Sequence, residues 1–225
     1  MIKGLYTSAA GMLGQVELQD AIANNLANCS TPGFKRTSVG FSAFHANLTA
    51  SIEKSPSNRS QSAECVFPKA FTQQDMSQGA MEDTGDPTNL AIDGAGAFVV
   101  RTGRGEHLTR SGNFQLNSSG RLVTTENEPV LGRNGPIQIS GSEWVIDADG
   151  NVEVDGATVD KLRIDSGAST PGRTIQGRLE SSNVNTVREM VSMITALRTY
   201  EASQRAIQSS DQTLDKLINQ MGKAV

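Results

Sequence analysis

The chain has 225 residues, of which 36% are hydrophobic and only 4% aromatic, and it contains 22 glycines. This length predicts one or two domains, and the composition provides little material for one large core while staying above the range of intrinsic disorder. The net charge of −4 argues against nucleic acid as a partner, because no basic stripe is available to displace counterions from phosphates. No run of 18 apolar residues is present, so we expect no direct membrane insertion.

The N-terminal stretch from Ile2 to Leu26 has the periodicity of an amphipathic helix. Because it is amphipathic rather than continuously apolar, we expect no cleaved signal peptide. Three glycines, Gly4, Gly11 and Gly14, weaken such a helix, but small residues also allow a second helix to approach closely. The two rows that repeat every seven residues are Leu5, Met12, Gln19, Leu26 and Ile2, Ala9, Val16, Ala23.

The segment after this helix predicts a turn and then a weakly patterned connector. Pro32-Gly33 is a turn signal, and Phe34 is expected to be a buried anchor below the turn. Phe41, Phe44 and Leu48 have helical spacing, which predicts a short helix. Residues 51–62 are polar and rich in Ser, which favours a flexible or extended stretch.

From about Gly79 the period of the apolar residues changes from 3.6 to 2, which indicates strands. Gly, Asn and Asp turns separate the short runs, as in antiparallel sheets, and Asp147–Asn151 fits a hairpin turn. We therefore expect an all-β domain inside the chain. The strand-like runs are 90–92, 97–100, 107–110, 113–116, 120–124, 129–131, 137–139, 144–146, 151–154 and 160–164.

The C-terminal run from Val184 to Met221 contains no Gly or Pro inside it and predicts a helix about 55 Å long. Ser181-Ser182-Asn183 offers N-caps before it. Two rows with heptad spacing form a narrow stripe, which favours packing against another helix. The rows are Met193, Tyr200, Ile207, Leu214, Met221 and Met190, Leu197, Gln204, Asp211, Ile218.

Two interpretations of these terminal stretches stay open. The helices pair as a coiled-coil-like module with the all-β domain inserted between them, or each is an ordinary amphipathic helix on a globular core. Gln204 and Asp211 either set the register of such a pair or lie where the stripe drifts toward water. On the first interpretation the fold is mixed α and β, with segments 1–35 (N-terminal helix), 36–80 (connector), 81–175 (all-β domain) and 176–225 (C-terminal helix).

No residue pattern indicates a metal, a cofactor or a catalytic site. His45 and His107 lie far apart, with no further ligands at metal spacing. Asp147–Gly150 begins like a calcium loop, but Val152 and Thr158 occupy the positions where an EF-hand needs Gly and Glu. We therefore expect a turn there and no metal.

Phosphate-binding and nucleophile motifs are also missing. Gly94-Ala95-Gly96 lacks the third glycine of a dinucleotide site and predicts a tight turn that leads into a strand. Glu126 and Glu128 are expected to be solvated turn residues, and no nucleophile elbow occurs, so we expect no enzyme and no cofactor. Cys29 and Cys65 are too few for a disulfide framework, and reduced thiols are favoured over a pair.

Short motifs lie at both ends of the chain and in its middle. They include Leu5–Met12, Thr31–Lys35, Leu90–Val100, Leu108–Phe114 and Leu179–Asn185, although Ala97 and Leu108 stand where an aromatic residue is usual. As a set the motifs resemble the flagellar axial proteins, the rod and hook subunits of the bacterial flagellum. The motif residues are Asn24, Asn25, Leu26, Ala27, Asn28, Gly33, Phe34, Gly94, Gly96, Phe98, Ser182, Asn183 and Val184.

The resemblance implies a structural, non-enzymatic subunit of the periplasmic basal-body rod, exported by the flagellar type III apparatus without a cleaved signal. It implies helical assembly with itself and other axial proteins around the export channel, with the terminal helices innermost, and transmission of torque. Asp86–Leu90 and Ala206–Leu217 look most like the proximal-rod subunit, with the distal-rod or hook type a near alternative. The expected assembly interface is Leu5, Met12, Val16, Leu26, Met190, Met193, Leu197, Tyr200, Ile207, Leu214 and Ile218.

Two other function classes are weighed against this one. A non-flagellar binding module, dimerised by its helices, would form a small closed oligomer and present a defined pocket in the β domain. A hydrolase whose carboxylates meet only in the fold would lose activity when Asp147 and Asp149 are replaced by Asn.

Overall fold

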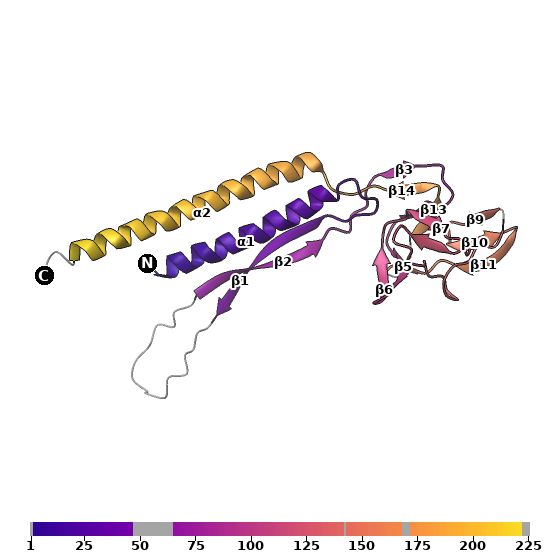
Figure 1. The fold of residues 1–225 in the computed structure, drawn as a ribbon, viewed down its shortest axis with the longest axis horizontal. Coiled ribbons are helices and arrows are strands. Elements are labelled where there is room, and N and C mark those ends of the chain that lie inside the picture. The colour runs from indigo at the N-terminus through magenta and orange to yellow at the C-terminus, as the bar shows by residue number, and fades with distance from the viewer. Residues whose placement is uncertain (1, 47–64, 142, 168–171, 222–225) are drawn as a thin grey trace, which may run out of the picture. The chain divides into compact units, whose positions relative to one another are not determined.

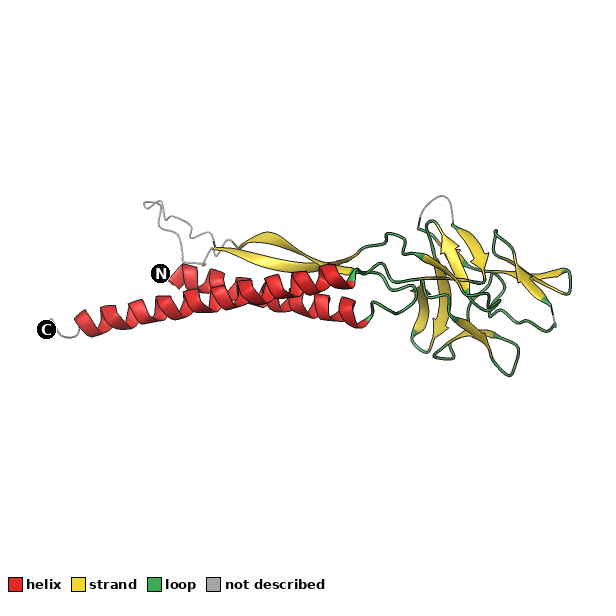
Figure 2. Ribbon diagram, turned by 90° about the horizontal axis from the view of Figure 1, so that it is seen from above, coloured by secondary structure: helices red, strands yellow, loops and turns green. Residues whose placement is uncertain are grey.

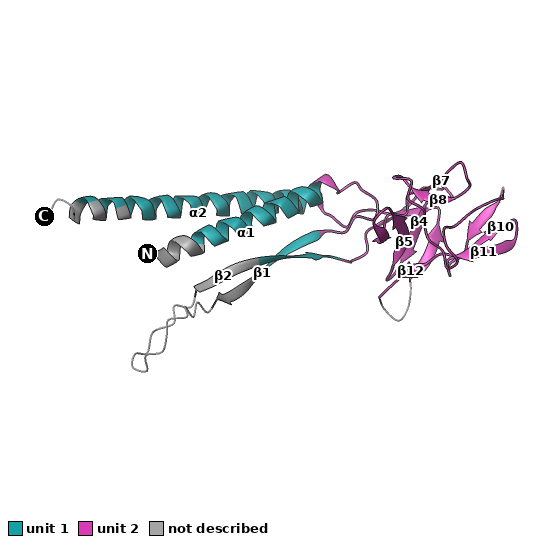
Figure 3. Ribbon diagram, turned by 60° about the horizontal axis from the view of Figure 1, so that its bottom comes forward, with its two compact units in different colours: residues 1–26, 37–75, 186–225 teal, residues 27–36, 76–185 magenta. Residues whose placement is uncertain are grey.

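The computed structural model describes residues 2–46, 65–141, 143–167 and 172–221, which form two helices and fourteen strands (Figure 1). The chain divides into two compact units, each built from segments that are distant in sequence (Figure 3). Unit 1 comprises residues 1–26, 37–75 and 186–225, and unit 2 comprises residues 27–36 and 76–185. The expected segments 1–35, 36–80, 81–175 and 176–225 remain a prediction.

Unit 1 contains both helices and one β-hairpin. The helices are α1 (Ile2–Ala27) and α2 (Thr186–Met221), which confirms the two helical predictions. They run in opposite directions along one another, with the hairpin alongside (Figures 1 and 2). The N-cap prediction is wrong: α2 begins at Thr186, so Asn185 precedes it, and the Oδ1 of Asn183 instead accepts a hydrogen bond from the N–H of Arg36 at 2.7 Å.

The hairpin replaces the short helix expected around Phe41. Strands β1 (Thr37–Ala46) and β2 (Cys65–Gln74) pair antiparallel from Thr37 opposite Gln74 to Ala46 opposite Cys65. The Phe41 ring lies on Gly14 of α1, where an added Cβ would be 2.6 Å from it. The β1–β2 pairing and the Phe41–Gly14 contact join residues that are distant in sequence, so the local spacing of apolar residues does not predict them. Leu48 and the expected connector 51–62 lie outside the described residues.

Unit 2 consists of strands and loops in its described residues (Figure 2). Its antiparallel pairings confirm the all-β prediction, with sheets ordered β11-β10-β9, β12-β5-β6, β13-β4, β14-β3 and β7-β8. The strands are β3 (Met81–Asp83), β4 (Leu90–Asp93), β5 (Ala97–Thr102), β6 (Gly105–Thr109), β7 (Phe114–Leu116), β8 (Leu122–Thr124), β9 (Trp144–Ile146), β10 (Asn151–Val154), β11 (Ala157–Lys161), β12 (Ile164–Asp165), β13 (Arg173–Gln176) and β14 (Arg178–Glu180).

The core of unit 2 is apolar and forms between these small sheets. The rings of Phe98 and Phe114 meet edge to face, with centroids 5.1 Å apart. The runs expected at 129–131 and 137–139 form only isolated bridges, yet they place Val130 and Ile137 in the core. The alternation of apolar residues therefore located the core even where it did not produce a regular strand.

Two predicted turns are present in unit 2. Gly94 and Gly96 have φ values of 103° and 136° between β4 and β5, a region that side chains strongly disfavour. The amide of Gly150 donates to the carbonyl of Asp147 at 2.8 Å between β9 and β10. Both segments shape the backbone, as the sequence predicted.

Candidate assembly interface

Helix α2 buries one narrow face within the subunit. Glu189 and Ala196 are buried, with exposed fractions of 0% and 3%, and Met193, Tyr200 and Ile207 are half-buried. With the half-buried Ser203 included, their spacing alternates between three and four residues, which is the spacing of a helix that packs against one neighbour. Met193, Tyr200 and Ile207 of the first predicted row lie on this face, and the side chains of Leu214 and Met221 lie outside the described residues. The second buried row begins at Glu189, one residue before the predicted Met190.

A second face of α2 is apolar and exposed. Five large apolar side chains lie there, and we call them the α2 apolar face. They are Val187 (69% exposed), Met190 (51%), Val191 (59%), Ile194 (52%) and Leu197 (44%). Their spacing of three or four residues places them on one side of the helix.

Helix α1 repeats the arrangement on a smaller scale. Leu13 (69% exposed) and Val16 (41%) form an exposed α1 apolar face. Met12 and Leu26 are half-buried, and Ile22 is buried. Each helix thus has an inward side, used within the subunit, and an apolar side that the subunit leaves uncovered.

The expected interface residues divide between these sides. Val16, Met190 and Leu197 lie on the apolar faces, while five others are half-buried, and the side chains of the remaining three lie outside the described residues. The half-buried five are Met12, Leu26, Met193, Tyr200 and Ile207, and the remaining three are Leu5, Leu214 and Ile218.

Sequence reasoning missed Val187, Val191, Ile194 and Leu13, which are among the most exposed apolar residues of the two helices. The sequence contained a signal for them, since the apolar residues of α2 occupy more positions around the helix than the two predicted rows. Gln204 and Asp211 are exposed, so within the subunit they lie toward water rather than in the buried face.

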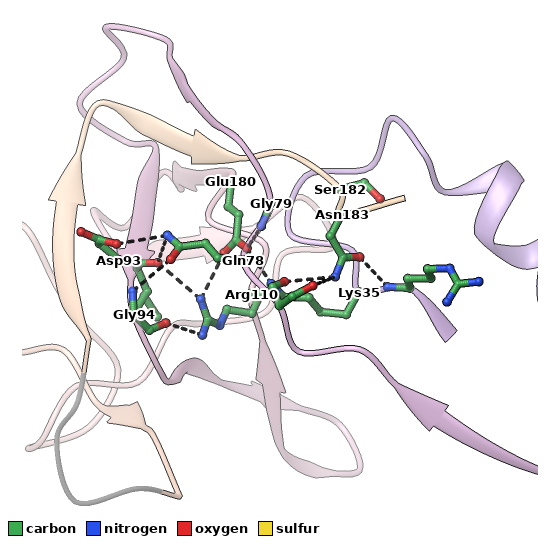
Figure 4. Close-up of polar contacts among 12 residues, drawn as sticks. Lys35, Gln78, Gly79, Asp93, Gly94, Arg110, Glu180, Ser182 and Asn183 are labelled. Carbon is green, nitrogen blue, oxygen red and sulfur yellow. Dashed lines mark hydrogen bonds and ion pairs between the residues drawn. The ribbon is translucent and has the colours of Figure 1, made fainter. Parts of the chain in front are cut away.

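Unit 2 contains a buried ion cluster, centred on Glu180 of β14 (Figure 4). The Nζ of Lys35 lies 2.6 Å from its Oε1, and the Nη1 of Arg110 lies 3.1 Å from its Oε2. The amide of Gly79 also donates to Oε1 at 2.8 Å. All three charged side chains are almost fully buried, with exposed fractions of 6%, 6% and 1%.

The two cations of the cluster make further hydrogen bonds to backbone carbonyls. Lys35 donates to Ser77 at 2.7 Å, and Arg110 donates to Ile92 at 3.3 Å and to Gly94 at 2.7 Å. The Lys35 bond connects the segment before β1 with the segment after β2, and the Arg110 bonds reach β4 and the turn that follows it. The cluster therefore joins three of the sequence motifs, because each motif contributes one charged residue.

Close backbone contacts surround this cluster. The amide of Gly33 donates to the carbonyl of Glu180 at 2.6 Å, and a Cβ on Gly33 would lie 2.3 Å from the backbone of Arg110. A Cβ on Gly112 would lie 1.5 Å from the carbonyl oxygen of Leu90. These positions accept only glycine without movement of the backbone.

The remaining motif residues differ in exposure and in their contacts. Asn25 is fully buried in α1, and Phe34, expected to be buried, is half-buried. The amide of Phe34 donates to the carbonyl of Thr31 at 3.3 Å across Pro32-Gly33, which closes the predicted turn. Asn24 and Ala27 are exposed, Leu26 is half-buried, and the amide of Val184 donates to the Oγ of Ser182 at 3.3 Å.

The described residues offer little that resembles a reaction centre. They contain no group of three or more His, Cys, Asp or Glu side chains placed to hold a metal, and no helix among them is long and apolar enough to cross a membrane. A surface hollow of about 460 Å³ in unit 2 is lined by Leu162 and Ile164 with three cations, Arg133, Lys161 and Arg163. Arg163 pairs with Glu106 at 3.0 Å.

Cys29 is a free, half-buried thiol. The side chain of Cys65 lies outside the described residues, so the expectation of two reduced thiols remains a prediction. His107 is exposed on β6.

Three family profiles match the chain in consecutive segments. They are described as flagella basal body rod protein (residues 5–35), flagellar hook protein FlgE/F/G D1 domain (residues 91–154) and flagellar basal body rod FlgEFG protein C-terminal (residues 175–221). The profiles therefore cover α1, much of unit 2 and α2.

Curated relatives match over nearly their whole length. The flagellar basal-body rod protein FlgG of Bacillus subtilis is 30% identical over 262 residues, covering 97% of this chain and 99% of the relative. The rod protein FlgF of Rhizobium meliloti is 30% identical over 249 residues, covering 99% of both chains. FlgG of Borreliella burgdorferi is 32% identical over 258 residues, covering 95% of this chain and 97% of the relative.

These three relatives carry two names, FlgG and FlgF, so the rod subtype remains a prediction. They are named as rod proteins and not as enzymes. With profiles along the chain and relatives at 30% identity or more over nearly all of it, this chain belongs to the flagellar basal-body rod protein family and is a structural subunit of the rod.

Proposed function

We propose that this rod subunit assembles helically through α1 and α2, whose exposed apolar faces pack against neighbouring rod subunits. The observation that carries the proposal is the α2 apolar face, where five large side chains on one side of the helix are 44–69% exposed. Single exposed apolar residues are common on proteins, but a contiguous exposed group marks an interaction surface.

Covering these side chains supplies a driving force for assembly. Full burial of one large aliphatic side chain stabilises by about 1.5–3 kcal/mol, and these are already about half covered. Covering the rest therefore contributes on the order of 1 kcal/mol for each residue. When the two residues of the α1 apolar face are added, the total stabilisation is comparable to the lower estimates of the free-energy cost of the translational and rotational freedom lost on association.

The location of the two faces favours an open assembly. They lie on different helices, so a contact that joins the α2 apolar face of one copy to another surface of its neighbour is heterologous. A heterologous contact that does not close into a ring generates a helical filament. Many parallel helix contacts would make such a tube stiff enough to transmit torque, with the helices around the export channel and the β unit outside.

The same proposal extends to export and location. We propose that the subunit passes through the flagellar type III export apparatus with α1 retained, and that it assembles in the periplasmic rod. Support comes from the buried residues that α1 contributes to unit 1, among them Ala21, Ile22 and Asn25. A leader that is removed after export could not supply them.

The test introduces a charge into the α2 apolar face of the full-length chain. We expect Ile194→Lys to reduce sedimentable helical assemblies and to reduce motility when it replaces the wild-type subunit in cells. The matched control is Val145→Lys on β9, because Val145 is equally apolar and is 58% exposed in unit 2. Both variants should keep the far-ultraviolet circular dichroism of the wild type.

The proposal would be wrong if Ile194→Lys assembled like the wild type while its expression and helix content were unchanged. Loss of assembly in Val145→Lys alone would instead assign the contact to unit 2. A small closed oligomer for both variants and the wild type would favour the binding-module alternative.

A further inference from the structure

One fully buried side chain connects three elements of unit 1. The Nδ2 of Asn25, on α1, donates to the Oε2 of Glu189 on α2 at 3.3 Å and to the carbonyl of Thr37 at 2.8 Å. Its Oδ1 accepts from the amide of Thr37 at 2.8 Å. Asn25 and Glu189 are both 0% exposed, so these bonds form away from water.

Stability alone does not explain a buried carboxylate beside a buried amide. Removing such groups from water is unfavourable, and apolar residues of similar volume are often at least as stable in their place. The position of Glu189 in the first turn of α2 reduces this penalty, because the N-terminal end of a helix favours negative charge. The best-attested benefit of a buried polar pair between helices is a fixed register.

The other residues of the two heptad rows that contain Asn25 and Glu189 give little register information. On α2 the residues that follow Glu189 at heptad intervals are Ala196, which is buried, and Ser203, which is half-buried. On α1 the residues that precede Asn25 at the same interval are Leu18 and Gly11, both half-buried. These small or aliphatic residues can replace one another when the helices slide by one heptad.

Sliding by one heptad separates Asn25 from Glu189. It would place Asn25 near Ala196, or Glu189 near Leu18, and so would bury both polar groups without each other. It would also move the α1 and α2 apolar faces past one another by about 10 Å, at 1.5 Å for each of the seven residues. A neighbour that fits the two faces in one register could not fit them in the other.

We propose that Asn25 and Glu189 are positioning residues that fix the register of α1 on α2 and thereby the alignment of the two apolar faces. The inference rests on the proposed function, since it concerns the same faces, but its measurement is a distance within one subunit. The same Asn25 side chain also fixes the start of β1, because the backbone amide and carbonyl of Thr37 both form hydrogen bonds with it.

The test measures the distance between two spin labels. The labels are placed at Asp20 of α1 and Gln208 of α2, both exposed, in a full-length chain in which Cys29 and Cys65 are replaced by Ser. Pulsed dipolar spectroscopy is done on the isolated subunit and on assemblies in which an excess of unlabelled chain suppresses distances between subunits. The wild-type pair should give one narrow distance.

The variant is Asn25→Leu combined with Glu189→Leu, which removes both polar groups of the pair. We expect helix content and melting temperature equal to or above those of the wild type. We also expect a second distance population displaced by about 10 Å, and a loss of assembly. The control, Gln212→Leu, makes an amide-to-leucine change at an exposed position of α2 and should keep the single distance.

A single unchanged distance in the double variant would overturn the inference, and so would a broad distribution in the wild-type chain. Failure of the proposed function looks different. In that case Ile194→Lys would assemble normally, whatever the distance measurement gives. Should the distance split while assembly stays intact, the register role would hold and its link to assembly would be wrong.

Discussion

Removing the carboxylate of Glu180 should destabilise unit 2 far more than removing an exposed carboxylate. In Glu180→Ala the side chains of Lys35 and Arg110, each 6% exposed, lose their common anion, and the amide of Gly79 loses its acceptor. Breaking a buried ion pair by removing one partner costs about 3–5 kcal/mol. Against a usual stability of 5–15 kcal/mol, this is a large fraction of the total.

The matched control is Glu106→Ala, which removes the partner of Arg163 from an ion pair whose side chains are 50% and 48% exposed. Exposed pairs of this kind contribute about 0–1 kcal/mol. For a domain of this size the difference between the two variants corresponds to a melting temperature on the order of 10–20 °C lower for Glu180→Ala.

Trp144 makes the measurement specific for unit 2. It is the single tryptophan of the chain, and it packs against the core of unit 2, so its fluorescence reports unfolding of that unit. Urea titrations should show a lower midpoint for Glu180→Ala at an unchanged slope. Equal midpoints for Glu180→Ala and Glu106→Ala would refute the view that the buried cluster holds unit 2 together.

Three further predictions concern other parts of the chain. Gly112→Ala should lower the free energy of unfolding by about 2–4 kcal/mol, measured as a lower urea midpoint, because its Cβ would meet the carbonyl oxygen of Leu90. Gly103→Ala, with open space around it, should stay near the wild type. The pKa of Asp86 should lie below its ordinary value of 3.8, because the amide and hydroxyl of Thr88 donate to its carboxylate. The small contribution of Asp86 to stability is therefore present above its ordinary pKa and is lost as the pH falls through the lowered pKa. Carbon NMR titration of the Asp86 carboxyl should show the lowered pKa, and Thr88→Ala should raise that pKa. Subunits taken from purified basal bodies should retain α1 by intact mass, and a mass that lacks it would contradict export without cleavage.

Local patterns were sufficient for the helices and for most strands of unit 2, but not for the hairpin of unit 1. Phe41 and Phe44 have helical spacing, yet Phe41 lies opposite Ala70 and against Gly14 of α1. Both partners are distant in sequence, so no local window contains the information. Tertiary contacts decided the structure of this segment.

The sequence also did not show which row of each helix faces the inside of the subunit. Apolar content favoured Met190 and Leu197, but the face that packs within the subunit uses Glu189 and Ala196 instead. Periodicity finds the repeat, but it does not tell which row faces the subunit and which faces a neighbour. A subunit that assembles has two apolar sides on each helix, and sequence alone assigns them poorly.

The ion cluster could not be derived from its motifs one by one. Lys35, Arg110 and Glu180 each stand in a separate motif as its one charged residue. Only the fold places both cations within 3.1 Å of the Glu180 carboxylate. The available signal was the presence of one charged residue in each motif. Complementary charges in separated, largely uncharged motifs are a reasonable basis for predicting such a cluster.

The central claim is that the terminal helices are the assembly device, and comparison of two chains tests it most directly. The first is the full-length chain, and the second is residues 27–185, which keeps both Lys35 and Glu180 and so retains all of unit 2. Negative-stain electron microscopy with sedimentation should show that the full-length chain forms or joins helical tubes, while residues 27–185 stay monomeric with native Trp144 fluorescence. Tubes formed by residues 27–185, or small compact particles of the full-length chain even with other axial proteins present, would contradict the claim.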